Sequence, residues 1–158
     1  ACKVPEHLVD EFAQSCLKRF AEKKFPPAIF NGLSNIVRNL AIDHTIAIIT
    51  TNSSQNVNAF LIEHGLDEYI HAVYGVDIPG SKAQKISIAR NQFAADPKRE
   101  SVFMVGDSLS DISAAKEASV TSIAVTWGHQ SLEHLLRGDP DYIVRFPHDL
   151  IEVIEKIE

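Results

Sequence analysis

Two acidic residues, Asp107 and Asp111, follow an apolar run at residues 101–105 and lie four positions apart. If a helix begins early in this segment, residues at that spacing share one helix face, so the two carboxylates point the same way. A pair of carboxylates suits a hard cation such as Mg²⁺, which prefers oxygen ligands and keeps several of its waters. Gly106 predicts a tight turn between the run and the pair. We therefore predict that Asp107 and Asp111 hold Mg²⁺.

Two further polar clusters accompany the acidic pair. Thr51 and Asn52 follow a run rich in β-branched residues, and Lys82 opens a segment with helical periodicity. A hydroxyl and an ammonium can hold phosphoryl oxygens while a metal neutralises the charge that develops there, so the three clusters together are typical of phosphoryl transfer. The predicted substrate contacts are Thr51, Asn52 and Lys82, and the predicted catalytic residues are Thr51, Lys82, Asp107 and Asp111.

Each cluster also has a purely structural interpretation. A Thr-Asn pair after a strand is most often turn chemistry, and a lysine at the start of a helix usually lies in solvent. An aspartate at a helix start is often an N-cap. Capping does not require a second aspartate one turn later, so the Gly-Asp-Ser-x-x-Asp segment at residues 106–111 is the strongest of the three signals. The order and spacing of all three clusters favour function.

Alternating strands and helices are expected along most of the chain. Short apolar runs predict strands, and segments with apolar residues every three or four positions predict helices. The expected strands are residues 45–50, 70–75, 101–105, 121–125 and 142–144; the expected helices are residues 33–40, 82–93 and 131–136, with others around Leu61, Ile112 and Ile154.

This alternation predicts an α/β fold, a three-layer α/β/α Rossmann-like core with a parallel sheet and helices on both faces. The runs at residues 45–50 and 101–105 are continuous and apolar, so we expect both strands to be buried on both faces. Ligands of such sheets bind at the carboxyl ends of the strands, which is where the polar clusters fall.

Before the first strand, the chain reads as helical. Leu8, Phe12, Cys16 and Phe20 repeat every four residues, which predicts an amphipathic helix over residues 7–24 that Pro26 and its neighbour end. We therefore divide the chain into residues 1–28, part of a helical cap, and residues 29–158, the α/β core.

Bulk composition excludes several classes of protein. The chain has 158 residues, a formal net charge of −6 and no basic stripe, which argues against nucleic-acid binding. It has no apolar run long enough to cross a membrane. Cys2 and Cys16 do not form a disulfide framework, and a reducing cytoplasmic setting is expected.

The order of these motifs resembles the haloacid dehalogenase superfamily, and more narrowly its phosphoglycolate-phosphatase-like branch with a helical cap. The resemblance runs from about residue 30 to the end, through residues 46–66, 80–86 and 102–128. It implies Mg²⁺-dependent hydrolysis of a small phosphomonoester through an aspartyl-phosphate. By this resemblance Thr51 is the phosphate-binding hydroxyl of the second motif and Lys82 the lysine of the third. Asp107 is then the acid on Mg²⁺, and Asp111 a second acid that supports the metal or the lysine.

Two features depart from the family pattern. Ser81 stands where the branch usually has glycine, so Lys85 remains a second candidate for the motif lysine. The family's first motif, an Asp-x-Asp pair that supplies nucleophile and general acid, is not found before residue 45: Asp10 falls in the expected helix, and Asp43 precedes a strand. Asp77, after a weak strand, is interpreted as a loop residue.

The missing motif is also a structural problem. In this family the first strand lies between the strands that carry Thr51 and Asp107. Without it, these two strands pair directly or leave unpaired backbone groups, which is costly. Our hypothesis is that the native protein has an upstream segment of several tens of residues that carries the aspartate nucleophile.

Two alternatives remain open. The first is an inactive relic that binds phosphate and Mg²⁺ and acts through partners. The second is a GDSL-type serine esterase with Ser108 as nucleophile, although no Asp-x-x-His pair follows to supply its base.

Overall fold

The computed structural model describes residues 5–8, 11, 15, 28–93 and 101–157. The predicted helix over residues 7–24 falls mostly outside the described residues, which in this stretch show the short 3-10 helix η1 (Glu6–Leu8) and helical conformation at Glu11 and Ser15. The assignment of residues 1–28 to a helical cap therefore stays a prediction.

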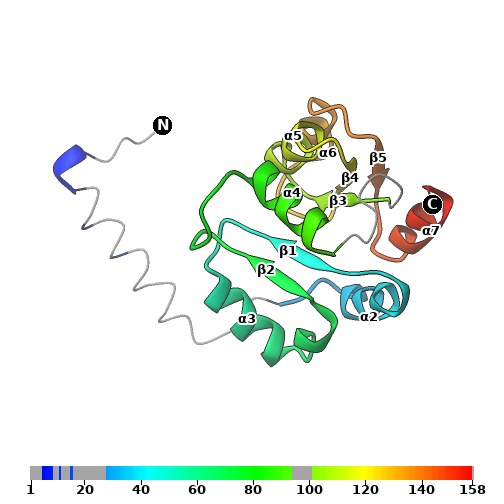
Figure 1. The fold of residues 1–158 in the computed structure, drawn as a ribbon. Helices are drawn as coiled ribbons and strands as arrows, with labels where there is room; N and C mark the ends of the chain where they lie inside the picture. The colour runs from blue at the N-terminus through cyan, green and yellow to red at the C-terminus, as the bar shows by residue number, and fades with distance from the viewer. Residues whose placement is uncertain (1–4, 9–10, 12–14, 16–27, 94–100, 158) are drawn as a thin grey trace.

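In the described residues, five parallel strands form two sheets (Figure 1). Strand β1 (Ala47–Ile49) pairs with β2 (Ala72–Tyr74). Strand β4 (Thr121–Val125) lies between β3 (Phe103–Gly106) and β5 (Tyr142–Val144). The parallel direction confirms the sequence prediction, since each pair of strands is joined through a helix.

Strands β1 and β3 do not pair with each other among the described residues; each is bonded on one edge, and these two strands end their sheets. The prediction that both strands are buried on both faces is wrong: β1 is half-buried throughout, and Val105 of β3 is 37% exposed. The physical reason is the missing neighbour, because a strand without a partner on one edge is reached by solvent from that side.

The helices match the predicted positions closely. Helix α4 occupies the predicted residues 82–93, and helix α2 continues three residues beyond its predicted end. In chain order the elements between the strands are α2 (Leu33–Asp43), α3 (Ser54–Glu63), η2 (Asp67–Tyr69), α4 (Lys82–Phe93), α5 (Leu109–Glu117), α6 (Leu132–Leu136) and α7 (Asp149–Ile157).

Helices cover both faces of the strands, which confirms the three-layer arrangement. On one face Ile36 of α2 and Ile154 of α7 pack with Ile123 and Val144 of the larger sheet. On the other face α4 and α5 pack together, and their cluster also contacts Ile49 of β1 and Met104 of β3. This second layer therefore bridges the two sheets.

A carboxylate fixes the entry to β5. Asp141 accepts hydrogen bonds from the backbone N–H of Ser122, at 2.8 Å, and from its hydroxyl, at 2.6 Å; Ser122 is fully buried. These bonds from the side chain and then the backbone of Ser122 hold the pKa of Asp141 below its usual value. The contact is far from the polar clusters and serves stability.

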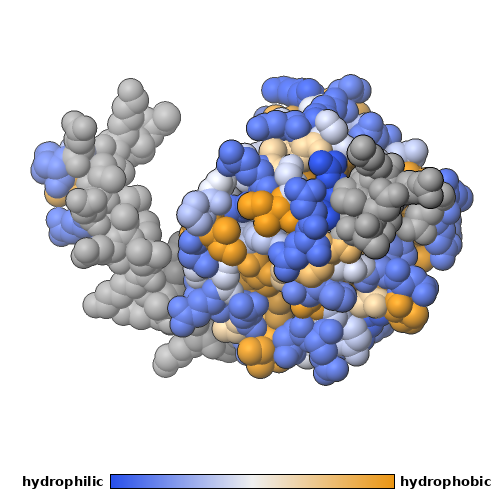
Figure 2. All heavy atoms as spheres, in the orientation of Figure 1, coloured by the Kyte–Doolittle hydropathy of each residue, from blue (hydrophilic) through white to orange (hydrophobic). Residues whose placement is uncertain are grey.

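No helix in the described part of the chain is long and apolar enough to cross a membrane. On the face drawn in Figure 2, hydrophobic residues form several separate areas between hydrophilic ones. Exposed apolar side chains scattered in this way are normal for a globular domain.

Candidate active site

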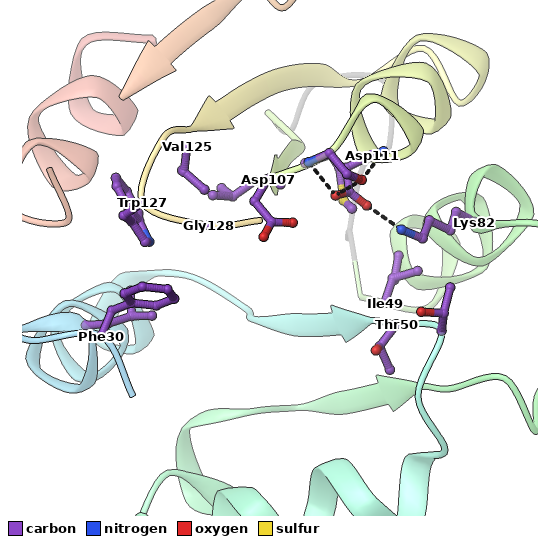
Figure 3. Close-up of a pocket in the computed structure, with 15 residues that line it drawn as sticks. Phe30, Ile49, Thr50, Lys82, Asp107, Asp111, Val125, Trp127 and Gly128 are labelled. Carbon is purple, nitrogen blue, oxygen red and sulfur yellow. Dashed lines mark hydrogen bonds and ion pairs between the residues drawn. The ribbon is translucent and has the colours of Figure 1, made fainter. Parts of the chain in front are cut away.

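A cleft of about 430 Å³ lies between β1 and β3 at their carboxyl ends (Figure 3). Four of the predicted site residues line it, namely Thr51, Lys82, Asp107 and Asp111. They come from the ends of β1 and β3 and from the helices that follow β2 and β3, so the fold brings together groups that are distant in sequence.

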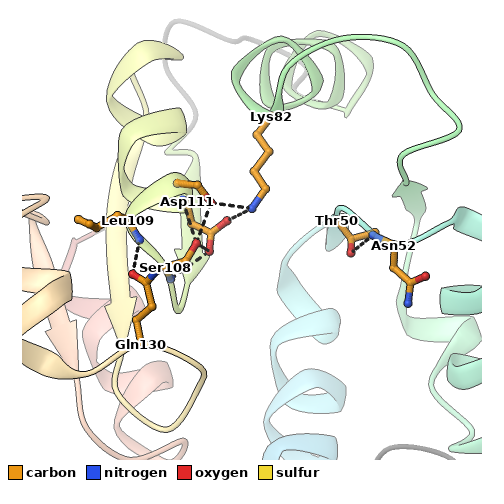
Figure 4. A network of polar contacts seen from close by, with 8 residues as sticks. Thr50, Asn52, Lys82, Ser108, Leu109, Asp111 and Gln130 are labelled. Atoms are coloured by element: carbon orange, nitrogen blue, oxygen red, sulfur yellow. Dashed lines mark hydrogen bonds and ion pairs between the residues drawn. The ribbon is translucent and has the colours of Figure 1, made fainter. Parts of the chain in front are cut away.

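Lys82 and Asp111 form an ion pair on one wall of this cleft (Figure 4). Lys82 Nζ donates to Asp111 Oδ1 at 2.6 Å and to Ser110 Oγ at 3.1 Å. The side chains are 23% and 9% exposed, so the pair is shielded from solvent on the Asp111 side. Between the two candidate lysines, Lys82 is the one that lies at the cleft. Lys85 is buried and donates to the carbonyl of Gly75 instead.

Asp111 is also part of a capping box, which the sequence interpretation had missed. Helix α5 begins at Leu109 with Ser108 as N-cap; the backbone N–H of Ser108 donates to Asp111 Oδ2, and the Ser108 hydroxyl accepts from the backbone of Asp111. The Ser-x-x-Asp spacing is a known signal for a helix start. Asp107 thus precedes the helix, and the expectation that Asp107 and Asp111 share a helix face is wrong.

Asp107 is held by the loop that follows β4. Its Oδ2 accepts a hydrogen bond from the backbone N–H of His129 at 2.7 Å, and its backbone carbonyl accepts from Gln130. Gln130 in turn accepts from the N–H of Leu109 with its side-chain oxygen. In Figure 3 the carboxylate points into the cleft, and among the described residues no hydrogen bond reaches its Oδ1. One oxygen of Asp107 is therefore fixed and the other is open to a ligand.

Two glycines allow these carboxylates to sit where they do. A Cβ atom at Gly106 would overlap with Asp111, and one at Gly128 would overlap with Asp107. Gly106 does not have a positive φ. It is therefore required for close packing, and the predicted reason, the conformation of a tight turn, is not the one observed.

Thr51 and Asn52 follow β1, on the side of the cleft opposite Lys82 and Asp111. Thr51 is exposed and lines the cleft. The side chain of Asn52 does not line it: its Oδ1 accepts from the N–H of Ser53 and from Asn56, at 2.8 and 3.2 Å, and so supports the start of α3 (Figure 4). Among the predicted substrate contacts, the structure thus brings Thr51 and Lys82 to the cleft and leaves Asn52 outside.

Apolar residues form the other end of the cleft. Phe30 comes from the segment before α2, and Trp127 follows β4 (Figure 3). Neither was a sequence candidate, because a lone aromatic residue has no spacing pattern that distinguishes a site from a core. These two side chains make this end of the cleft apolar.

The carboxylates of the cleft fit only part of a metal shell. Among the described residues no cluster of three or more His, Cys, Asp or Glu could hold a metal ion. Asp111 already accepts bonds from Lys82 and Ser108, whereas Asp107 has an open oxygen of the kind that Mg²⁺ prefers. Asp107 therefore has an open oxygen, whereas both oxygens of Asp111 are engaged, and the assignment of Mg²⁺ to these two residues stays a prediction.

The Ser108 hydroxyl takes part in the start of α5. Its hydroxyl bonds to Asp111 Oδ2 at 2.7 Å and to Ser110 Oγ at 2.8 Å, and no histidine of the described segments hydrogen-bonds to it. A serine whose hydroxyl serves as a helix cap is a poor nucleophile, so the esterase alternative is not supported.

Comparison with known proteins shows the family. The family model described as haloacid dehalogenase-like hydrolase matches residues 3–125, most of the chain. The chain belongs to this family.

Two curated relatives of this chain are phosphoglycolate phosphatases. The chain is 28% identical, over 132 residues, to a phosphoglycolate phosphatase from Synechococcus elongatus; the match covers 82% of this chain and 60% of that protein. It is 32% identical, over 111 residues, to a phosphoglycolate phosphatase from Vibrio parahaemolyticus, covering 70% and 49%. The matched region is thus about half to three fifths of these relatives.

A solved structure shows the same fold. A haloacid dehalogenase-like family protein from Streptococcus pneumoniae superposes with a TM-score of 0.84 at 21% identity, over 96% of this chain and 72% of that one. The likeness confirms the Rossmann-like α/β class.

Proposed function

We propose that the intact protein is a Mg²⁺-dependent phosphatase of a small phosphomonoester of the phosphoglycolate kind, with an aspartate nucleophile on a strand between β1 and β3. The observation that carries the proposal is the convergence of Lys82, Asp107 and Asp111 on one cleft, flanked by two strand edges that lack a partner among the described residues. The names of the curated relatives support the same chemistry.

The facing edges of β1 and β3 support the position of the nucleophile. Unpaired edges offer backbone donors and acceptors that pair readily with another extended segment. A strand parallel to both would join the two sheets, and its carboxyl end would lie beside Asp107 and Lys82. The direct pairing of β1 with β3 that would have contradicted this hypothesis is not observed.

In the proposed reaction, a carboxylate oxygen of that strand attacks phosphorus, and the ester P–O bond breaks. The leaving alcohol takes a proton from the second aspartate of the same strand. Water then attacks phosphorus and gives a proton to the second aspartate, the bond from phosphorus to the first aspartate breaks, and inorganic phosphate leaves. Each step needs positive charge near the phosphoryl oxygens, because negative charge builds up there.

Residues of this chain supply binding and charge. The Thr51 hydroxyl can donate to a phosphoryl oxygen, and the Lys82 ammonium, oriented by Asp111, faces the same space. Asp107 would hold Mg²⁺ with its open oxygen, and the ion would neutralise the phosphoryl group. Phe30 and Trp127 restrict the space for the alcohol and so favour a small substrate.

Two measurements test this proposal. The intact mass of the protein purified from its natural source shows whether it extends beyond 158 residues. Hydrolysis of p-nitrophenyl phosphate and phosphoglycolate is then followed with Mg²⁺ and with EDTA. We expect a longer protein whose activity requires Mg²⁺ and is lost in Asp107→Ala.

The isolated chain of 158 residues is the matched control, and we expect it to bind inorganic phosphate without turnover. Full activity of this chain alone would contradict the proposed position of the nucleophile. If the protein from its natural source has the mass of 158 residues and no activity, the result would instead support the alternative of an inactive relic that binds phosphate. The cytoplasmic setting stays a prediction.

A further inference from the structure

Lys85 is a buried cation that the proposed chemistry does not use. Its residue is 5% exposed, and its Nζ donates to the carbonyl oxygen of Gly75 at 2.7 Å. It lies on α4 three positions after Lys82, so the two lysines belong to the same short part of the helix. Burying an ammonium group costs free energy unless hydrogen-bond partners compensate for its lost hydration.

The carbonyl that Lys85 holds belongs to a close junction between the loops that follow β1 and β2. The N–H of Gly75 donates to Ser54 Oγ at 3.0 Å, and a side chain at Gly75 would overlap with the backbone of Ser54. The N–H of Ser54 donates to Asp77 Oδ1 at 2.6 Å. We call Lys85, Gly75, Ser54 and Asp77 the loop clamp.

The loop clamp contains one residue of each charge, Asp77 and Lys85. The backbone N–H of Ser54 is the main reason why the pKa of Asp77 lies below its usual value, and the positive charge of Lys85 lowers it further. Asp77 itself is exposed and lies in the loop after β2, as the sequence interpretation expected.

The loop clamp is attached to both phosphate-binding elements. On one side, the N–H of Val76 donates to the carbonyl of Asn52 at 2.8 Å, next to Thr51. On the other side, the backbone N–H of Ser81 donates to the side-chain oxygen of Gln84, and the backbone N–H of Gln84 donates to the Ser81 hydroxyl oxygen. These two bonds fix the first turn of α4, which carries Lys82. Lys85 thus connects the helix that carries Lys82 to the loop that carries Thr51.

We propose that Lys85 is a positioning residue: through Gly75 it sets the separation between the Thr51 hydroxyl and the Lys82 ammonium, and so the affinity for the phosphoryl group. This role rests on the proposed phosphatase function. Lys85 does not line the cleft, so its effect has to pass through the loops. Small displacements of binding groups are enough to weaken such a site strongly.

The test compares Lys85→Met with Lys85→Arg in the intact, active protein. Methionine keeps the length and the apolar stem but donates no hydrogen bond, whereas arginine keeps charge and donors. We expect Lys85→Met to raise both the KM for p-nitrophenyl phosphate and the inhibition constant of inorganic phosphate by about tenfold, with a smaller change in kcat. We expect Lys85→Arg to recover most of the loss.

Two further variants separate positioning from stability. Ser122→Ala removes a buried hydroxyl and its bonds to Asp141 far from the cleft, so it should lower the unfolding temperature and leave KM unchanged. Asp77→Asn keeps the side-chain oxygen that accepts from Ser54 but loses the charge, so it gives a milder disturbance of the loop clamp if Lys85→Met does not fold. We expect Asp77→Asn to raise KM by about threefold.

The outcomes are distinguishable. Loss of stability in Lys85→Met and Asp77→Asn with unchanged KM and phosphate inhibition would overturn the positioning role and leave the phosphatase proposal intact. A wild-type protein without phosphatase activity would overturn the proposed function, and the role of Lys85 with it.

Discussion

Strand β4 and the strands β1 and β3 have similar apolar sequences but different surroundings. Ile123, Ala124 and Val125 of β4 are 1%, 0% and 6% exposed, because β4 is bonded to a strand on each side. In β3, Val105 is 37% exposed, and β1 is half-buried throughout. The comparison teaches that a β-branched run predicts a strand, whereas the neighbours on both edges decide how deeply it is buried.

The same two regions differ in their polar groups. The groups at the ends of β1 and β3, such as Thr51 and Asp107, line the cleft. The end of β4 leads to Thr126, whose hydroxyl bonds to the carbonyl of Arg145 and stays within the larger sheet. The cleft is thus lined by polar groups that follow strands bonded on one edge, and the end of β4 contributes Trp127 and Gly128 to it.

The largest expected effect is on catalysis at the end of β3. In the intact protein, Asp107→Asn should lower kcat by about a hundredfold or more, because it weakens the metal ligand but keeps an oxygen for the His129 N–H. Steady-state kinetics at saturating Mg²⁺ measures this loss. Thr126→Val at the end of β4 is the matched control and should leave kcat nearly unchanged. Equal losses in the two variants would remove the distinction between these strand ends.

The next effect is on stability. In the isolated chain, Ile123→Ala should lower the free energy of unfolding by about 2–5 kcal/mol, because a fully buried side chain leaves a cavity. Val105→Ala should cost about 1 kcal/mol or less, since this residue is partly in solvent. Urea unfolding measures both.

Repeating Val105→Ala in the longer protein sharpens the comparison. If an additional strand covers β3, the free-energy cost of this substitution should rise towards that of a buried valine. The same cost in both proteins would show that Val105 has no further neighbour.

A smaller effect concerns the ion pair between Lys82 of α4 and Asp111 of α5. Lys82→Met removes the cation that pairs with the mostly buried carboxylate of Asp111. It should lower the free energy of unfolding by about 1–2 kcal/mol, which is less than for a fully buried pair because Lys82 is partly exposed. Lys116→Met is the control, because its partner Asp139 is 95% exposed and such pairs contribute little. A double-mutant cycle with Asp111→Asn isolates the pair, and a coupling no larger than that of Lys116 and Asp139 would contradict the prediction.

The smallest effect is the pH dependence of the larger sheet. The bonds from Ser122 hold the pKa of Asp141 below its unfolded value, so their stabilisation is fully present above the unfolded pKa of about 3.9 and is lost as pH falls through the lower folded pKa. Asp141→Asn should therefore flatten the fall in urea midpoint on acidification below about pH 4. An unchanged acid profile in Asp141→Asn would show that this carboxylate does not contribute.

Local sequence patterns predicted most elements. The helix at residues 82–93 and the strand at residues 121–125 have the predicted bounds, because periodicity and β-branched runs are properties of consecutive residues. The helix expected around Ile112 had no predicted start, although the signal for it, Ser108 followed by Asp111, is present in the sequence.

Sequence alone determined the parallel α/β class and the residues Thr51, Lys82, Asp107 and Asp111 that line the cleft, whereas the expectation of a strand between β1 and β3 came from the resemblance to a family. Tertiary structure decided which lysine faces Asp111, that Asn52 turns towards α3, and that Lys85 is buried against Gly75. The physical reason is range: residue type and spacing act along a few turns of chain, whereas burial and charge pairing depend on groups that only folding brings together.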